Sequence, residues 1–220
     1  MPTRLKTTSV PEAVYDALRE RILSARIAPG ELVTETAIAV EYGVARPTAK
    51  AALERLVAEG LLTRRAHKTA RVPQLDRADI IDLFENRAIV ESAAIAALAS
   101  EPAPGRVPEA ALAAHRELLE QARADAPFAQ EDIAFHRALV AGQTSPRLAR
   151  MHALLMGEIE LCIGQVQAHH LLTARAVASQ HQGILDAVVA GNADLASRLT
   201  REHIVGTRER LLAHYDSIHS

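Results

Sequence analysis

The sequence predicts a mainly α-helical protein, in which an N-terminal winged helix-turn-helix precedes a C-terminal six-helix antiparallel bundle. Three observations support this fold class. The apolar residues, 49% of the 220, are mostly Ala, Leu, Val and Ile, and only 3% of residues are aromatic, a mix that suits packed helices. Strand-like sequence is confined to a short stretch near residues 61–72. A linker at 73–76 separates the two expected domains, 1–73 and 74–220.

The N-terminal domain is expected to contain three helices and a hairpin. Val14, Leu18 and Ile22 recur every four residues, and Pro11 suits a first helical turn. Gly43 and Gly60 follow the second and third helices, where a left-handed residue commonly ends a helix. The expected elements are helices near 11–25, 34–42 and 46–59 and strands near 61–65 and 70–72.

The C-terminal domain shows helical periodicity throughout, without the alternation typical of strands. Proline and glycine mark several of the breaks between its segments, as at Pro102–Gly105 and Gly191. The expected helices lie near 76–100, 108–124, 127–141, 146–169, 172–190 and 192–216. Such a pattern predicts a bundle with its own core.

Charge and cysteine content narrow the class of protein. Residues 1–72 hold 12 Lys and Arg against 8 Asp and Glu, whereas residues 73–220 hold 13 against 19. A basic head on an acidic body favours a polyanion-binding head. Cys162 is the one cysteine, so no internal disulfide is possible, and a reducing cytoplasm is the expected location. No run of 18 apolar residues occurs, so we expect no membrane partner.

Cationic residues gather where a helix-turn-helix protein contacts DNA. The third helix opens at Arg46, and its first turns can point polar side chains outward while Ala49, Leu53 and Leu56 face inward. The wing tip adds further cations for phosphate or minor-groove contact. An ordinary solvated face remains the alternative for any one of them. The candidate DNA-binding residues are Arg46, Thr48, Lys50, Arg64, Arg65, His67 and Lys68.

The head resembles the GntR family of bacterial regulators. Residues 18–32 are similar to the family's opening helix and turn, 42–53 to its recognition helix, and 56–62 to the close of that helix. The resemblance implies double-stranded operator DNA as partner. Because two recognition helices spaced by one DNA turn can read a palindrome, we expect a homodimer. The sequence departs from the family pattern at Thr36, Ala45 and Thr69.

A carboxylate and three imidazoles are expected inside the bundle. Asp132 and His136 are four residues apart and share a helix face that looks inward. His181 lies on the apolar face of the fifth helix of the bundle, and His203 lies on the apolar face of the sixth. Unpaired polar groups there would be costly, and a divalent transition metal would satisfy all four. Hydrogen-bonded core histidines, as we expect for His115, remain the alternative.

The bundle resembles the FadR C-terminal domain (FCD) of GntR regulators, over residues 76–214, and its six helices resemble the VanR-like branch. In many of these domains an Asp-x-x-x-His pair and two later histidines bind a metal. The resemblance implies that Asp132, His136, His181 and His203 do so here, with zinc favoured and nickel, manganese or iron possible.

An arginine is expected to bind the effector. Arg87 matches a family arginine that faces the effector cavity, where a guanidinium can hold a carboxylate. A salt bridge to Glu91, four residues on, is the alternative. Further candidates for the cavity are Arg137, Gln165 and Arg210.

These features together predict a regulator rather than an enzyme. We expect a homodimeric repressor that a small organic acid, bound at the metal, releases from its operator. A metalloregulator, in which the ion is the signal, is the first alternative, and a metal-dependent hydrolase is the second. A metal that only stabilises the bundle is the third.

Overall fold

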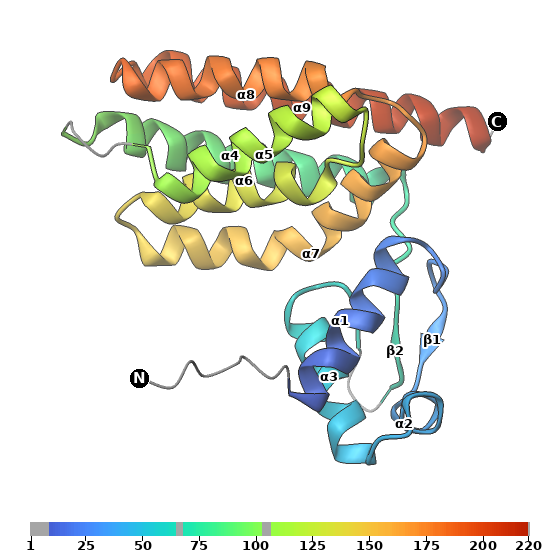
Figure 1. Ribbon diagram of the computed structural model, residues 1–220. Helices are drawn as coiled ribbons and strands as arrows, with labels where there is room; N and C mark the ends of the chain where they lie inside the picture. The colour runs from blue at the N-terminus through green and yellow to red at the C-terminus, as the bar shows by residue number, and fades with distance from the viewer. Residues whose placement is uncertain (1–8, 65–67, 103–106, 220) are drawn as a thin grey trace, which may run out of the picture. The chain divides into compact units, whose positions relative to one another are not determined.

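The computed structural model describes residues 9–64, 68–102 and 107–219, which form two compact units, Met1–Gln74 and Leu75–Ser220 (Figure 1). The predicted fold class is confirmed: the first unit is a helix-turn-helix head and the second an all-helical body. None of the helices in these three stretches is long and apolar enough to cross a membrane.

The head contains the three predicted helices. α1 and α2 both pack against α3, around a core that includes Leu18, Leu53 and Leu56. Thr34 caps α2, because its side chain accepts a hydrogen bond from the Ala37 amide at 3.1 Å. The elements of the head are α1 (Val10–Leu23), β1 (Leu32–Val33), α2 (Glu35–Tyr42), α3 (Arg46–Ala58) and β2 (Ala70–Arg71).

The predicted hairpin was wrong in its first strand. β2 pairs antiparallel with β1, a two-residue strand that the sequence pattern did not reveal, and Thr63 forms only an isolated bridge to Arg71. Leu61 and Leu62 are both buried, at 0% and 1% exposure, whereas neighbouring residues of a strand point to opposite faces. This stretch therefore closes the head's core, and the wing begins later than expected.

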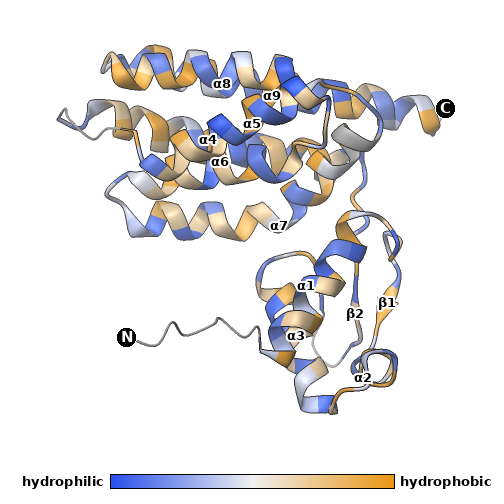
Figure 2. Cartoon of the chain, viewed as in Figure 1, coloured by the Kyte–Doolittle hydropathy of each residue, from blue (hydrophilic) through white to orange (hydrophobic). Residues whose placement is uncertain are grey.

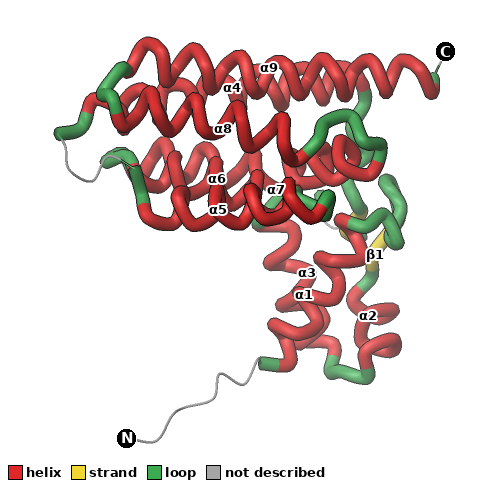
Figure 3. Tube along the Cα trace, turned by 45° about the horizontal axis from the view of Figure 1, so that its top comes forward, coloured by secondary structure: helices red, strands yellow, loops and turns green. Residues whose placement is uncertain are grey.

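The body is the six-helix bundle that the periodicity predicted. Its helices run alongside one another (Figures 1 and 3), and each mixes hydrophilic with hydrophobic residues (Figure 2). The helices are α4 (Arg77–Ser100), α5 (Glu109–Ala124), α6 (Ala129–Gly142), α7 (Pro146–Ala168), α8 (Ala174–Val189) and α9 (Ala193–Ile218). Asp76 begins α4 with a capping box, in which its side chain and that of Asp79 each accept from the other's backbone N–H.

α4 is the central helix of this bundle. It packs along α9 and also contacts α6, α7 and α8, and 12 of its 24 residues are buried. Two of the buried residues, Arg87 and Glu91, are charged. The interior of the body is therefore polar at its centre, between two apolar clusters that include Phe84 and Phe135.

Candidate metal centre and nucleic-acid interface

The recognition helix presents its first turn as the sequence predicted. α3 begins at Arg46, and Ala45 before it has extended backbone and makes no side-chain cap. Arg46 and Lys50 are exposed and Thr48 is half-buried, whereas Ala49 is fully buried. Arg46 and Lys50 therefore lie on the outer face of α3, where Lys50 also pairs with Glu54 at 3.5 Å, while Ala49 packs the helix on the head.

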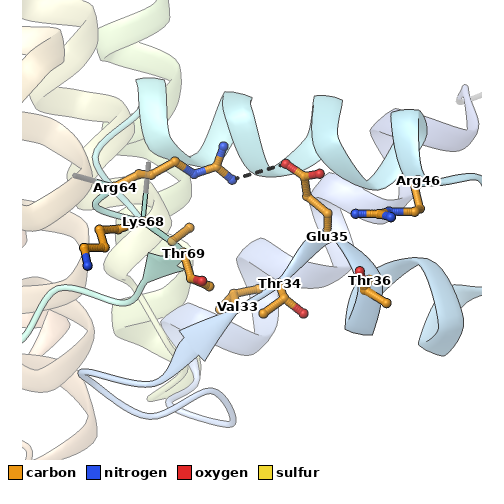
Figure 4. A pocket seen from close by; sticks show the side chains of 9 residues that line it. Val33, Thr34, Glu35, Thr36, Arg46, Arg64, Lys68 and Thr69 are labelled. Atoms are coloured by element: carbon orange, nitrogen blue, oxygen red, sulfur yellow. Dashed lines mark ion pairs between the residues drawn. The ribbon is translucent and has the colours of Figure 1, made fainter. Parts of the chain in front are cut away.

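A hollow in the head lies between the wing and the starts of α2 and α3 (Figure 4). Arg46 and Arg64 extend from opposite sides toward Glu35, and Arg64 Nη2 lies 3.8 Å from a Glu35 carboxylate oxygen. The lining residues are Val33, Thr34, Glu35, Thr36, Arg46, Arg64, Lys68, Thr69 and Ala70. Three cations and one carboxylate line the hollow, so its surface carries a net positive charge, which suits phosphate.

Two of the predicted wing residues, Arg65 and His67, lie outside the described residues. Glu35, by contrast, was missed as part of this surface. Its position at the start of α2 did not indicate a role in DNA binding. Acidic residues are common in the first turn of a helix, where they interact favourably with the helix dipole.

Three helices of the body bring the predicted metal ligands together. Asp132 and His136 come from α6, His181 from α8 and His203 from α9. None is more than 5% exposed, and each offers one ligand atom within 4.8 Å of the others. Four donors on three inward faces thus meet at one point, as their helical spacing predicted.

The distances between these donor atoms suit a small transition-metal ion. Nε2 of His136 lies 3.1 Å from Nε2 of His203, and Oδ1 of Asp132 lies 3.3 Å from Nε2 of His181. The same oxygen is 3.8 Å from His136 Nε2 and 4.0 Å from His203 Nε2. Ligand atoms that surround zinc tetrahedrally at about 2.0 Å lie about 3.3 Å from one another.

The partners of the outer ring nitrogens indicate where the protons are. His203 Nδ1 lies 2.7 Å from Gln180 Oε1, and His136 Nδ1 lies 2.6 Å from Glu91 Oε2. Because each oxygen can only accept, we assign the proton of each ring to Nδ1; the His203 contact is an aligned hydrogen bond, whereas the His136 contact is close without that alignment. The two Nε2 atoms then face each other with lone pairs. A cation between them would turn this repulsion into ligation.

Electrostatics favour the protonation state that a metal requires at three of the four residues. Burial lowers the pKa of His181 to about 4, and burial with the neighbouring imidazoles lowers that of His203 well below its usual range. Burial alone would raise the pKa of Asp132, but the three imidazoles lower it. Neutral imidazoles beside an ionised carboxylate are ready ligands. The residues present therefore fit a divalent ion.

Arg87 lies beside this cluster and is fully buried. Its Nε donates to Glu91 Oε1 at 2.8 Å, so the salt bridge considered from the sequence is present. Its Nη1 and Nη2 are buried without a hydrogen-bond partner among the described residues. Leaving two charged N–H groups unpaired inside a protein is costly, and a carboxylate is the ligand that a guanidinium accepts in pairs.

Two other effector candidates do not reach the interior. The Arg137 side chain is 45% exposed and pairs with Glu160 at 3.8 Å, because its position beside His136 turns it to the outer face of α6. Arg210 is exposed, and its Nη1 donates to the carbonyl oxygen of Gly206 at 2.9 Å. The side chain of Gln165 lies outside what the structure describes.

Two buried residues near the cluster were not predicted as parts of the site. Glu91 contacts His136 and Arg87, and the His152 Nε2 lies 2.9 Å from its Oε1. His115 behaves as expected for a core histidine: it is 4% exposed, and its Nε2 lies 3.1 Å from Gln182 Oε1.

Comparison with known proteins identifies both units. The model of the "Bacterial regulatory proteins, gntR family" matches residues 11–72, and the FCD domain model matches residues 82–206. The chain is 28% identical over 203 residues to a probable D-xylose utilization operon transcriptional repressor from Paenarthrobacter nicotinovorans, covering 91% of this chain and 88% of that protein. It is 27% identical to the HTH-type transcriptional repressor GlaR from Escherichia coli, covering 87% and 90%.

Solved structures share the fold. A GntR transcriptional regulator from Rhodococcus sp. RHA1 superposes with a TM-score of 0.75 at 23% identity, covering 92% of this chain and 97% of that one. McbR/YncC from Escherichia coli gives a TM-score of 0.64 at 17% identity, covering 97% of this chain and 100% of that one.

Proposed function

We propose that this chain, which belongs to the gntR family of bacterial regulatory proteins and carries an FCD domain, is a repressor released from its operator by a small organic acid. It is a transcription regulator by family, and the relatives named as repressors support the direction of control. Such a protein would act in the cytoplasm, where Cys162 stays reduced. The six body helices support a place in the VanR-like branch.

The observation that carries the sensing half of this proposal is that Nη1 and Nη2 of Arg87 have no hydrogen-bond partner among the described residues and lie next to four residues that fit a metal ion. Asp132, His136, His181 and His203 would hold the ion, with zinc favoured by their nitrogen and oxygen donors and nickel, manganese or iron as alternatives. A bound ion would supply a Lewis-acid position for one carboxylate oxygen. Arg87 Nη1 and Nη2 would bind the acid from the other side.

The DNA-binding half rests on the cationic surface of the head. Arg46, Thr48 and Lys50 would meet base edges or phosphates in the major groove, and Arg64 and Lys68 the backbone beside it. Arg65 and His67 complete the set of residues that we propose to contact DNA. One head reads too few base pairs for specificity, so we propose a homodimer on a palindromic operator, with half-sites spaced by about 34 Å.

Burial of the metal site favours a second candidate, in which the ion itself is the signal. Four protein donors at no more than 5% exposure are enough to complete a tetrahedral site without any further ligand. In that case operator affinity would follow the metal concentration, and organic acids would have no effect at saturating metal.

Operator binding under defined metal and acid conditions separates the two. Operator DNA is first selected from a random pool, and its affinity is then measured by fluorescence anisotropy with chelator, with zinc, and with zinc plus each of a panel of small carboxylic acids. Our proposal expects an acid that weakens zinc-loaded binding by about 5–150-fold, the effect of 1–3 kcal/mol of coupling.

Arg87→Gln provides the matched variant, since it removes the charge and keeps a polar side chain. It should retain operator binding and lose the response to acid. A response to metal alone favours the metalloregulator, and a wild-type affinity that follows neither metal nor acid overturns both candidates.

A further inference from the structure

Glu91 lies where three helices of the body meet, and it is fully buried. Both of its carboxylate oxygens have close partners. Oε1 accepts from Arg87 Nε at 2.8 Å and lies 2.9 Å from His152 Nε2, and Oε2 lies 2.6 Å from His136 Nδ1. One side chain of α4 thus links a metal-ligand histidine on α6, a buried histidine on α7, and the arginine proposed to bind the effector.

Burying a carboxylate at this position costs free energy unless its charge and hydrogen bonds are satisfied. An ionised carboxylate taken out of water needs paired charge and hydrogen bonds to remain there. Arg87 supplies the charge, since a guanidinium stays protonated in proteins. An apolar side chain would fill the same space between α4 and α6 without this requirement, so packing alone does not explain why a carboxylate stands at Glu91.

The contact with His136 decides which of its nitrogens can bind a metal. His136 Nδ1 and Glu91 Oε2 lie 2.6 Å apart, although neither atom forms an aligned hydrogen bond among the described residues. A proton on Nδ1 is the tautomer that keeps two lone pairs from facing each other at this distance, so we assign the proton to Nδ1. Nε2 then carries the lone pair that can bind a metal, and it is the atom that faces His203 Nε2 at 3.1 Å. A carboxylate behind a ligating imidazole also raises its basicity and holds the plane of its ring.

We propose that Glu91 is the positioning residue of the metal centre: it holds His136 with Nε2 toward the other ligands, and with its other oxygen it fixes the guanidinium of Arg87. The ion site and the carboxylate site are therefore built on the same side chain. This inference rests on the proposed function, because it requires an ion at the four ligands.

Metal affinity of two Glu91 variants tests the proposal. Zn²⁺ affinity is measured by competition with a chromophoric chelator, and Co²⁺ is used as a spectroscopic probe through its visible absorption. Losing a carboxylate behind a metal ligand commonly weakens binding by about 10–100-fold. We expect a loss in this range for Glu91→Ala. Glu91→Gln, which keeps an oxygen able to accept from His136 Nδ1, should recover part of it.

Glu160→Gln is the matched control, because Glu160 is a buried glutamate on α7 whose ion pair is with Arg137 rather than with a ligand. It should change Zn²⁺ affinity by less than threefold and leave the Co²⁺ spectrum unchanged. If Glu91 only stabilised the bundle, its variants would lower the melting temperature of the metal-free protein and preserve the Co²⁺ spectrum. That result overturns the proposal.

A measurement on the unmodified chain does not depend on any variant folding. In the zinc-loaded protein, ¹⁵N shifts of the histidine rings report which nitrogen bears the metal, and we expect Nε2 coordination of His136 with a protonated Nδ1. Coordination through Nδ1 overturns the role of Glu91 while leaving the metal centre intact. A wild-type protein that binds neither Zn²⁺ nor Co²⁺ overturns the metal centre, and this inference with it.

Discussion

Replacing His181 by alanine should remove most of the stability that a bound ion gives the body. The His181 ring is fully buried and stacks on Phe135 with ring centroids 3.8 Å apart. Neither of its nitrogens has a hydrogen-bond partner within the described part of the chain. Without metal, the lost packing of about 2–5 kcal/mol is partly offset, because unsatisfied buried groups that cost about 1–3 kcal/mol each disappear with the ring.

With metal, the expected loss is larger and can be calculated. At a free zinc concentration about 1,000 times the wild-type Kd, binding stabilises the folded protein by about 4.1 kcal/mol. We take a loss of about 100-fold in affinity for the missing donor, the upper end of what a supporting residue costs. The same zinc then gives only about 1.4 kcal/mol. The metal-induced rise in melting temperature should therefore shrink by about 5–11 °C, at about 2–4 °C per kcal/mol.

The assay is thermal unfolding followed by circular dichroism, with chelator and at the fixed zinc concentration. His115→Ala is the control, because His115 is also a buried histidine and its ring centroid lies 6.3 Å from that of His181, but its Nε2 pairs with Gln182 and it is not one of the four ligands. It should lower the melting temperature in both conditions and keep the full metal-induced rise. An equal rise in His181→Ala and His115→Ala would show that His181 is not a ligand.

Three further results are expected. Arg46→Ala should lower operator affinity by about 1–3 kcal/mol and leave the melting temperature of the body unchanged. Affinity is measured by fluorescence anisotropy with operator and scrambled DNA. Equal operator affinity of the variant and the wild type would show that Arg46 does not contribute to operator recognition. Acid should destabilise the metal-free protein between about pH 6.5 and 4, because burial lowers the pKa of His181 to about 4 and the unfolded chain binds the proton first. This contribution is fully present above pH 6.5, and equal urea midpoints at pH 4.5 and 7.5 would contradict it. Gly142→Ala should destabilise the body by about 1–3 kcal/mol in urea unfolding, since its Cβ would lie 2.2 Å from Pro108 Cγ; a midpoint equal to that of the wild type would mean that this contact relaxes freely.

The helices and the four inward donors could be predicted because both follow from local spacing. Asp132 and His136 share a face through their separation of four, and His181 and His203 lie among apolar residues on theirs. β1 could not be predicted, since two residues give no alternation, and its partner lies more than thirty residues away. The prediction of the wing's first strand was wrong because two neighbouring leucines, which suggested a strand, instead belong to the core of the head.

The role of Glu91 depended on packing that spacing does not contain. Its separation of four from Arg87 made their salt bridge the alternative to effector binding, but its contacts with His136 and His152 arise only when α4 lies between α6 and α7. A signal was present nonetheless, because Glu91 continues the buried face of α4 that runs through Phe84 and Arg87. A charged pair on a buried helix face is a reason to look for a polar site. For Arg137 the prediction failed because it directly follows a ligand, His136, in the sequence. Adjacent residues of a helix point in different directions, so the Arg137 side chain lies on the outer face.

The charges inside the body connect the ion to the class of effector. Arg87, Glu91 and Asp132 are all buried, and with the imidazoles neutral they carry a net charge of −1. A divalent ion would change the net charge of these three residues and the ion to +1, and one monocarboxylate would then bring the sum to zero, whereas the same acid without the ion would bring it to −2. Burying unbalanced charge is costly, so the acid binding that we propose would require the ion. A regulator that needs the metal to admit its ligand would bind both as one unit, and Glu91, in contact with Arg87 and His136, lies between them.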